Sequence, residues 1–181
     1  NKKVILLTCH RRENWGEPME EIFRAVKSIV KENPDTHLIF PMHLNPIVRN
    51  AAKSILGDND RISLIEPLDY EPFANLMAKS YLLLTDSGGV QEEAPALGKP
   101  VVVLRTETER PEAVEAGTVK VAGVKEEKVY QISDRLIRDK SYYESVANAV
   151  NPYGDGKASI RIADYLLYKF GILNKEIDEF K

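Results

Sequence analysis

The sequence contains a single cysteine, Cys9, among 181 residues, so no disulfide can form within the chain. This cysteine usage is typical of a reducing compartment, and we expect a cytoplasmic protein. Only three histidines are present, and together with Cys9 they show none of the spacings of a zinc site. We therefore expect no bound metal.

Long apolar runs and a surplus of basic residues are also missing. No apolar run approaches the ~20 residues that span a bilayer, and the N-terminus lacks the layout of a signal peptide. The net charge is −3, with 25 basic and 28 acidic residues, which argues against a broad basic face for nucleic acid. We expect neither a membrane nor a nucleic acid as a partner.

Short apolar runs alternate with helical patterns along the whole chain. We predict strands at Val4–Leu7, Leu38–Phe40, Ile62–Ile65, Tyr81–Leu84, Val101–Leu104 and Thr118–Ala122. We predict helices at Pro18–Lys31, Pro46–Leu56, Tyr70–Ala78, Val90–Leu97, Glu126–Arg138, Ser141–Ala149 and Lys157–Phe170. Apolar strands without alternation indicate a parallel sheet covered on both faces. The pattern predicts an α/β fold, a Rossmann-like doubly wound sheet of six parallel strands.

The length fits one domain of generous size, with a small appendage at most. We place a boundary so that residues 1–155 form the Rossmann-like domain and residues 156–181 carry the final helix. The chain enters its first apolar strand within three residues and has no initiator Met. This start is what we expect of a piece of a longer protein.

Ligands of doubly wound folds bind at the carboxyl ends of the strands, so the loops after the strands are the candidate site. His10 and Arg11 follow the first strand. An imidazole donates to phosphate or moves a proton, and a guanidinium matches phosphate oxygens. The alternative is a solvated loop with an internal Arg–Glu pair. His43, after the second strand, has the same two interpretations, with the structural one favoured.

Two further loops offer groups for a nucleotide. Phe73, after the third strand, either stacks on a nucleobase or belongs to the core, and spacing alone favours the core. Ser87, Gly88 and Gly89 join the fourth strand to a helix, whose free N–H groups and dipole suit a phosphate or diphosphate. The helix dipole alone also explains nearby acids such as Glu93, although a carboxylate beside a diphosphate can bind ribose hydroxyls.

Neither of the standard phosphate-binding fingerprints is present. The sequence contains no G-x-G-x-x-G and no G-x-x-x-x-G-K-[ST] motif. After the fifth strand, Arg110 stands directly before Pro111 at a predicted helix start, where it can face the same crevice.

Three segments carry a resemblance to a known family: "HRREN", "TDSGGVQEEAPALGKPVVVLRTETERPE" and "NPYGDGKAS". Together they resemble the non-hydrolysing UDP-N-acetylglucosamine 2-epimerases, in order and over essentially the whole chain. The resemblance implies one half of a GT-B-type enzyme with two Rossmann-like domains, and this sequence matches the C-terminal domain. The N-terminal domain, with the principal acid–base carboxylates, would be missing.

The resemblance also implies an activity and its partners. The family interconverts UDP-N-acetylglucosamine (UDP-GlcNAc) and UDP-N-acetylmannosamine (UDP-ManNAc) by eliminating UDP to 2-acetamidoglucal and adding it again, with no cofactor. Implied partners are UDP, UDP-N-acetylhexosamine, the missing domain and a second subunit of a full-length homodimer. Residues 156–181 would pack against the missing domain through an apolar face that includes Ile162, Tyr165, Leu166 and Phe170.

Carried over residue by residue, the resemblance implies roles for the candidates named above. Diphosphate would bind at Ser87, Gly88 and Gly89, with ribose at Glu93 and uracil beside Phe73. His10 and Arg110 would serve the reaction in the cleft. Arg11 and His43 would contact a second, allosteric UDP-GlcNAc molecule.

Three alternatives stay open. A hydrolysing UDP-GlcNAc 2-epimerase and a GT-B glycosyltransferase domain share the fold and the nucleotide. A regulatory domain that senses nucleotides would bind without chemistry. The "HRREN" loop favours an epimerase over a glycosyltransferase, and the isolated chain is expected to have little or no epimerase activity.

Overall fold

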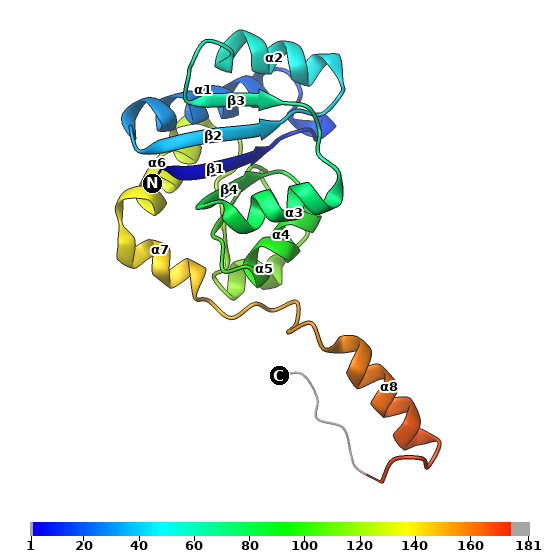
Figure 1. Cartoon of the computed structure of the whole chain (residues 1–181). Coiled ribbons are helices and arrows are strands. Elements are labelled where there is room, and N and C mark those ends of the chain that lie inside the picture. The colour runs from blue at the N-terminus through cyan, green and yellow to red at the C-terminus, as the bar shows by residue number, and fades with distance from the viewer. Residues whose placement is uncertain (1, 175–181) are drawn as a thin grey trace.

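The computed structural model describes residues 2–174 and confirms the predicted α/β architecture (Figure 1). One sheet of six parallel strands has the order β3-β2-β1-β4-β5-β6. The strands are β1 (Lys3–Thr8), β2 (Thr36–Pro41), β3 (Ile62–Ile65), β4 (Leu82–Thr85), β5 (Val101–Val103) and β6 (Val119–Val121).

Helices connect the strands and follow the last of them. They are α1 (Glu17–Glu32), α2 (Pro46–Leu56), α3 (Tyr70–Lys79), α4 (Gly88–Ala96), α5 (Pro111–Glu115), α6 (Glu126–Arg138), α7 (Lys140–Ala147) and α8 (Ala158–Lys169). A 3-10 turn, η1 (Arg12–Asn14), lies in the loop that the sequence pattern left without structure. Helix α4 begins two residues earlier than the predicted Val90, so both glycines of the candidate site belong to its first turn.

The sheet is covered on both faces by separate apolar clusters. On one face Ile5 and Leu7 of β1 pack with helices α1, α2, α6 and α7, and on the other Leu6 packs with α3, α4 and α5. The larger cluster rests on α1, which buries seven side chains: Met19, Ile22, Phe23, Ala25, Val26, Ile29 and Val30. Burial of one large apolar side chain contributes about 1.5–3 kcal/mol to the stability of the fold. These seven side chains therefore hold α1 firmly against the sheet.

The strand order reverses between β1 and β4, because the chain adds β2 and β3 on one side of β1 and then crosses to the other. Thr8 and Thr85, the last residues of these two strands, lie opposite each other in the parallel register. In doubly wound folds ligands bind outside the carboxyl ends of the strands at such a point. The loops after β1 and β4 are therefore neighbours in the candidate site.

Helix α8 stands apart from the sheet at the end of an extended connection (Figure 1). None of its residues is buried. The exposed large apolar side chains of this region are Ile160, Ile162, Tyr165, Leu166, Leu167, Tyr168, Phe170 and Ile172. Residues 175–181 of the predicted appendage lie outside the described residues. Within residues 2–174 no helix is long and apolar enough to cross a membrane.

Candidate functional site

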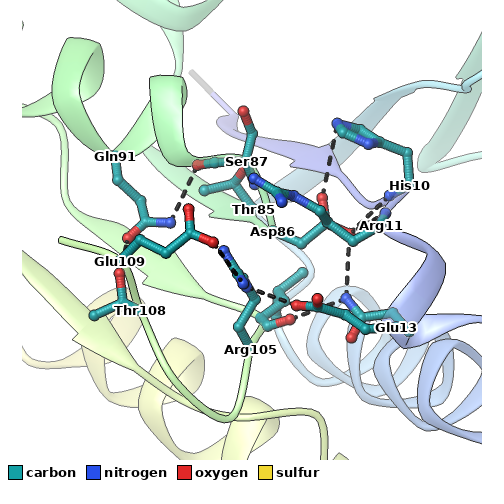
Figure 2. A network of polar contacts seen from close by, with 12 residues as sticks. His10, Arg11, Glu13, Thr85, Asp86, Ser87, Gln91, Arg105, Thr108 and Glu109 are labelled. Carbon is teal, nitrogen blue, oxygen red and sulfur yellow. Dashed lines mark hydrogen bonds and ion pairs between the residues drawn. The ribbon is translucent and has the colours of Figure 1, made fainter.

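The loops after β1 and β4 are held together by a buried carboxylate, Asp86, which directly follows β4 and has no exposed surface. Its Oδ2 accepts hydrogen bonds from the backbone N–H groups of His10 and Arg11, both at 2.8 Å (Figure 2). It also accepts one from Nδ2 of the buried Asn14 at 3.1 Å, and Asn14 donates to the Leu104 carbonyl as well. Asp86 thus fixes the backbone of the "HRREN" loop against β4.

Ser87 is the N-cap of α4, but its side chain makes no capping hydrogen bond. Its own backbone N–H donates to Thr85 Oγ1 at 2.9 Å. The N–H groups in the first turn of a helix have no acceptor within the helix, and the helix dipole adds partial positive charge there. The start of α4 has the chemical character of an anion-binding site.

Gly88 and Gly89 carry no side chain, so a ligand can approach the backbone closely at this helix end. Neither has a positive φ, so the backbone itself does not require glycine. A Cβ atom on Gly88 would lie 3.7 Å from Nη2 of Arg110 and 4.0 Å from Nη2 of Arg11. The space beside Gly88 is therefore flanked by two guanidinium groups, an arrangement that suits phosphate oxygens.

The two adjacent acids of α4 have different surroundings. Glu92 accepts a short hydrogen bond from Nε of Arg110, and this contact raises the pKa of the Arg110 guanidinium. Glu93 is exposed, and within residues 2–174 its carboxylate makes no hydrogen bond or ion pair. A Cβ on Gly89 would lie 3.8 Å from Glu93 Oε1, so this free carboxylate lies beside the helix start.

Arg105 joins two loops of the site and is only 9% exposed. Its Nε donates to Glu13 Oε1 at 2.7 Å, and its Nη2 donates to Glu109 Oε1 at 3.4 Å (Figure 2). The contact with Arg105 holds the pKa of Glu109 below its usual value. The guanidinium links the "HRREN" loop to the "TERPE" loop that carries Arg110.

The loop before Arg110 is also tied to α4. The Thr108 hydroxyl donates to Gln91 Oε1 at 2.6 Å, and Nε2 of Gln91 donates to the Ser87 carbonyl at 3.2 Å (Figure 2). The backbone N–H of Arg110 donates to Thr108 Oγ1 at 3.1 Å. These contacts set the position of Arg110 relative to the start of α4.

A cavity of about 360 Å³ opens beside this helix end. Its lining comes from the ends of β1 and β2, from the loops after β1, β2, β3 and β4, and from α3 and α4: Thr8, His10, Pro41, His43, Leu44, Pro67, Leu68, Phe73, Ser87 and Val90. The His10 and His43 rings are 5.7 Å apart at their centroids. Phe73 lines the cavity and also packs against the smaller core cluster. Its side chain is therefore part of the core and is also placed where it could contact a nucleobase.

The structure therefore brings together all the candidates predicted from the sequence. Four line the cavity: His10, His43, Phe73 and Ser87. Arg11, Arg110 and Glu93 lie around the two glycines at the start of α4.

Sequence reasoning assigned no role to several polar residues that build the site: Asn14, Asp86, Gln91, Arg105 and Thr108. The sequence position of Asp86 was a usable signal, because an acid that directly follows β4 must lie at the edge of the sheet. In the structure its side chain is buried there. Among residues 2–174 there is no group of three His, Cys, Asp or Glu side chains arranged to hold a metal ion.

Comparison with known proteins identifies the family. The sequence profile of the family described as "UDP-N-acetylglucosamine 2-epimerase" matches residues 1–167. The chain belongs to this family. The UDP-N-acetylglucosamine 2-epimerase of Bacillus subtilis (strain 168) is 56% identical over 178 residues, which are 98% of this chain and 47% of that protein. The resemblance seen in the sequence motifs is confirmed.

Two solved structures show the same fold. The S. aureus MnaA–UDP co-structure has a TM-score of 0.91 and 53% identity, covering 99% of this chain and 49% of that one. The UDP-GlcNAc 2-epimerase from Neisseria meningitidis bound to UDP-GlcNAc has a TM-score of 0.86 and 49% identity, covering 92% and 45%. The chain spans about half the length of the epimerases it matches, and it corresponds to one Rossmann-like half. The roles of individual residues stay predictions.

Proposed function

We propose that this chain is the UDP-binding half of a UDP-GlcNAc 2-epimerase. The complete enzyme would interconvert UDP-GlcNAc and UDP-ManNAc by eliminating UDP and adding it again to 2-acetamidoglucal. The observation that carries the proposal is the helix start at Gly88, which carries no side chain and is flanked by the guanidiniums of Arg11 and Arg110. Solved relatives that contain UDP or UDP-GlcNAc support the choice of nucleotide.

Each part of the nucleotide has a matching group in the proposed site. The diphosphate binds at Ser87, Gly88 and Gly89, through the Ser87 hydroxyl, which makes no capping hydrogen bond, and the N–H groups of the two glycines. Glu93 is free to accept hydrogen bonds from the ribose, because its carboxylate has no partner among the described residues and lies beside the helix start. Phe73 offers an aromatic surface for the uracil in the adjoining cavity.

The chemistry of the proposed reaction explains why guanidinium groups flank the diphosphate site. As UDP leaves the sugar, negative charge grows on its diphosphate. Donors that are already oriented towards that charge stabilise it most in the transition state. The Arg110 guanidinium is held in place by Glu92, and the backbone N–H of Arg110 donates to the Thr108 hydroxyl. His10, at the same edge of the sheet, is proposed to act on the reacting sugar.

Arg11 and His43 are proposed contacts of a second UDP-GlcNAc molecule. Arg11 flanks the space beside Gly88, and the His43 ring lies in the same cavity as His10. Both residues are therefore close enough to the proposed UDP site for the second UDP-GlcNAc to contact the bound UDP directly. The second ligand would then act on the first without a conformational change elsewhere in the protein.

The complete enzyme requires more than this chain. We propose that its acid–base carboxylates come from the other half of the longer relatives, so that this chain alone has little or no epimerase activity. We further propose that α8 packs against that half, because it exposes Ile162, Tyr165, Leu166 and Phe170 and none of its residues is buried. A homodimer of the complete enzyme and a cytoplasmic location belong to the same proposal.

Calorimetric titration with UDP tests the nucleotide site. Glu93→Gln removes a charged acceptor, and a hydrogen bond to a charged group contributes about 1.5–3 kcal/mol. We expect a loss in affinity of about 10-fold or more. Glu115→Gln removes the same charge from an exposed position on α5 and should leave the affinity unchanged.

A second ligand sharpens this test. 2′,3′-Dideoxy-UDP lacks the hydroxyls that Glu93 is proposed to bind, so Glu93→Gln should weaken its binding much less than that of UDP. An equal loss for both ligands would remove Glu93 from the ribose. Unchanged UDP affinity in both Glu93→Gln and Ser87→Ala would refute the proposed site.

A further inference from the structure

The two oxygens of the Asp86 carboxylate have very different surroundings. Oδ2 accepts three hydrogen bonds, from the backbone of His10 and Arg11 and from the Asn14 side chain. Oδ1 is equally buried, yet it has no hydrogen-bond partner among the described residues. A buried carboxylate oxygen without a donor is costly, and such an exception calls for a physical reason.

The imidazole of His10 faces this unpartnered oxygen. Its Nε2 is 3.9 Å from Asp86 Oδ1, beyond hydrogen-bond distance but within the range of an ion pair (Figure 2). The backbone of His10 is already fixed by Oδ2 of the same carboxylate, while its side chain is 39% exposed towards the cavity. A small rotation of the ring closes the gap, and catalytic hydrogen bonds are often long before a ligand binds.

Other groups near Asp86 do not fill the same role. Asn14 is engaged with Oδ2 and with the Leu104 carbonyl. The Cys9 thiol is buried close by. Its pKa is raised first by burial, then by the negative charge of Asp86 and by the contact of the thiol with the Asp86 carboxylate. This thiol remains a weak S–H donor. On the cavity side, the His43 ring lies with its centroid 5.7 Å from that of His10.

We propose that Asp86 is a positioning residue that selects the tautomer of His10, with Oδ1 accepting the proton on Nε2. Nδ1 of the neutral ring is then left unprotonated as a proton acceptor. The meaning of this tautomer for the reaction rests on the proposed function, in which His10 acts on the sugar. The contact itself does not depend on it.

Nitrogen-15 NMR of the histidine rings tests the proposal without any nucleotide. The chain has only three histidines. Neutral His43 serves as an internal reference, because its Nδ1 accepts the backbone N–H of Asn45 and its proton must therefore sit on Nε2. We expect neutral His10 to carry its proton on Nε2 as well. We also expect that proton to exchange slowly enough to be observed, unlike that of the exposed His43.

The Asp86→Asn variant should reverse the tautomer. Its amide oxygen can replace Oδ2 as acceptor for the three N–H donors, which places the NH2 group opposite the His10 ring. An NH2 group donates, so Nε2 must become the acceptor and the proton must move to Nδ1. A purely structural role for Asp86 would leave the tautomer as it was. Cys9→Ala, which removes the competing thiol, should leave His10 unchanged.

Three results would overturn the proposal: a proton on Nδ1 in the unmodified protein, a rapidly exchanging Nε2 proton, or an unchanged tautomer in folded Asp86→Asn. If that variant does not fold, the proton exchange of the unmodified protein decides. UDP affinity is measured separately. A protein that shows the predicted tautomer but binds no UDP would refute the proposed function and leave the Asp86–His10 contact standing.

Discussion

Replacing Gly88 with alanine separates the stability of the fold from the binding of UDP. The added Cβ would meet its nearest neighbours, Nη2 of Arg110 and Nη2 of Arg11, at 3.7 and 4.0 Å, which is ordinary van der Waals contact. Gly88 has no positive φ and begins α4, so alanine fits its backbone conformation. Alanine favours a helix over glycine by about 0.5–1 kcal/mol in the interior, so unfolding free energy should stay constant or rise slightly.

The affinity for UDP should fall in Gly88→Ala. The methyl group would occupy the space in which a phosphate oxygen approaches the first-turn N–H groups. Loss of one hydrogen bond to a charged group costs about 1.5–3 kcal/mol, which corresponds to a roughly 10- to 150-fold loss of affinity.

Urea denaturation and calorimetry with UDP, at one salt concentration, measure the two effects. Gly89→Ala is a graded comparison, since its Cβ would approach only Glu93 Oε1 among the described atoms. UDP affinity unchanged in Gly88→Ala would refute the reasoning, as would a destabilised fold with normal binding per folded molecule.

Three further changes test other contacts. Tyr143→Phe removes the hydrogen bond to the Tyr81 carbonyl and should cost about 1 kcal/mol in urea denaturation at neutral pH. Burial raises the pKa of Tyr143 to about 12. The stabilisation by the neutral hydroxyl is therefore present below about pH 10 and is lost as the pH rises through the pKa of the folded state. Between these two pH values Tyr143→Phe should lose less stability than the unmodified protein. In Arg105→Lys one ammonium cannot bridge Glu13 and Glu109, so we expect the free energy of unfolding to fall by about 1–2 kcal/mol and UDP to bind more weakly. An unchanged free energy of unfolding would show that the bridge does not stabilise the fold. Phe73→Leu keeps an apolar side chain at the core but removes the aromatic face, so UDP affinity should fall several-fold with little change in the urea midpoint.

The fold was predictable because local patterns specify it. The central strands β1, β4 and β5 carry short apolar runs without alternation, which only a sheet buried on both faces accommodates. The rule that ligands bind beyond the carboxyl ends of parallel strands then selected the right loops. His10, His43, Phe73 and Ser87 do line one cavity, although they follow four different strands.

The connections between those loops could not be predicted, because they depend on strand order and on pairs far apart in the chain. Asp86 reaches His10 only because β4 lies beside β1 with Thr85 opposite Thr8. The contact between Arg105 and Glu13 spans 92 residues of sequence and requires both loops in place. Periodicity gives a residue's face on its own element and carries no information about such partners.

A titration of the nitrogen-15-labelled protein with UDP, followed by its backbone amide resonances, tests the central claim most directly. We expect the largest shifts at Ser87, Gly88 and Gly89, and we expect uridine, which lacks the diphosphate, to leave these amides nearly unchanged. A second cavity lies between α1 and α6, lined by residues that include Glu21 and Lys125. Shifts centred there, or no shifts at the start of α4, would contradict the assignment of the UDP site.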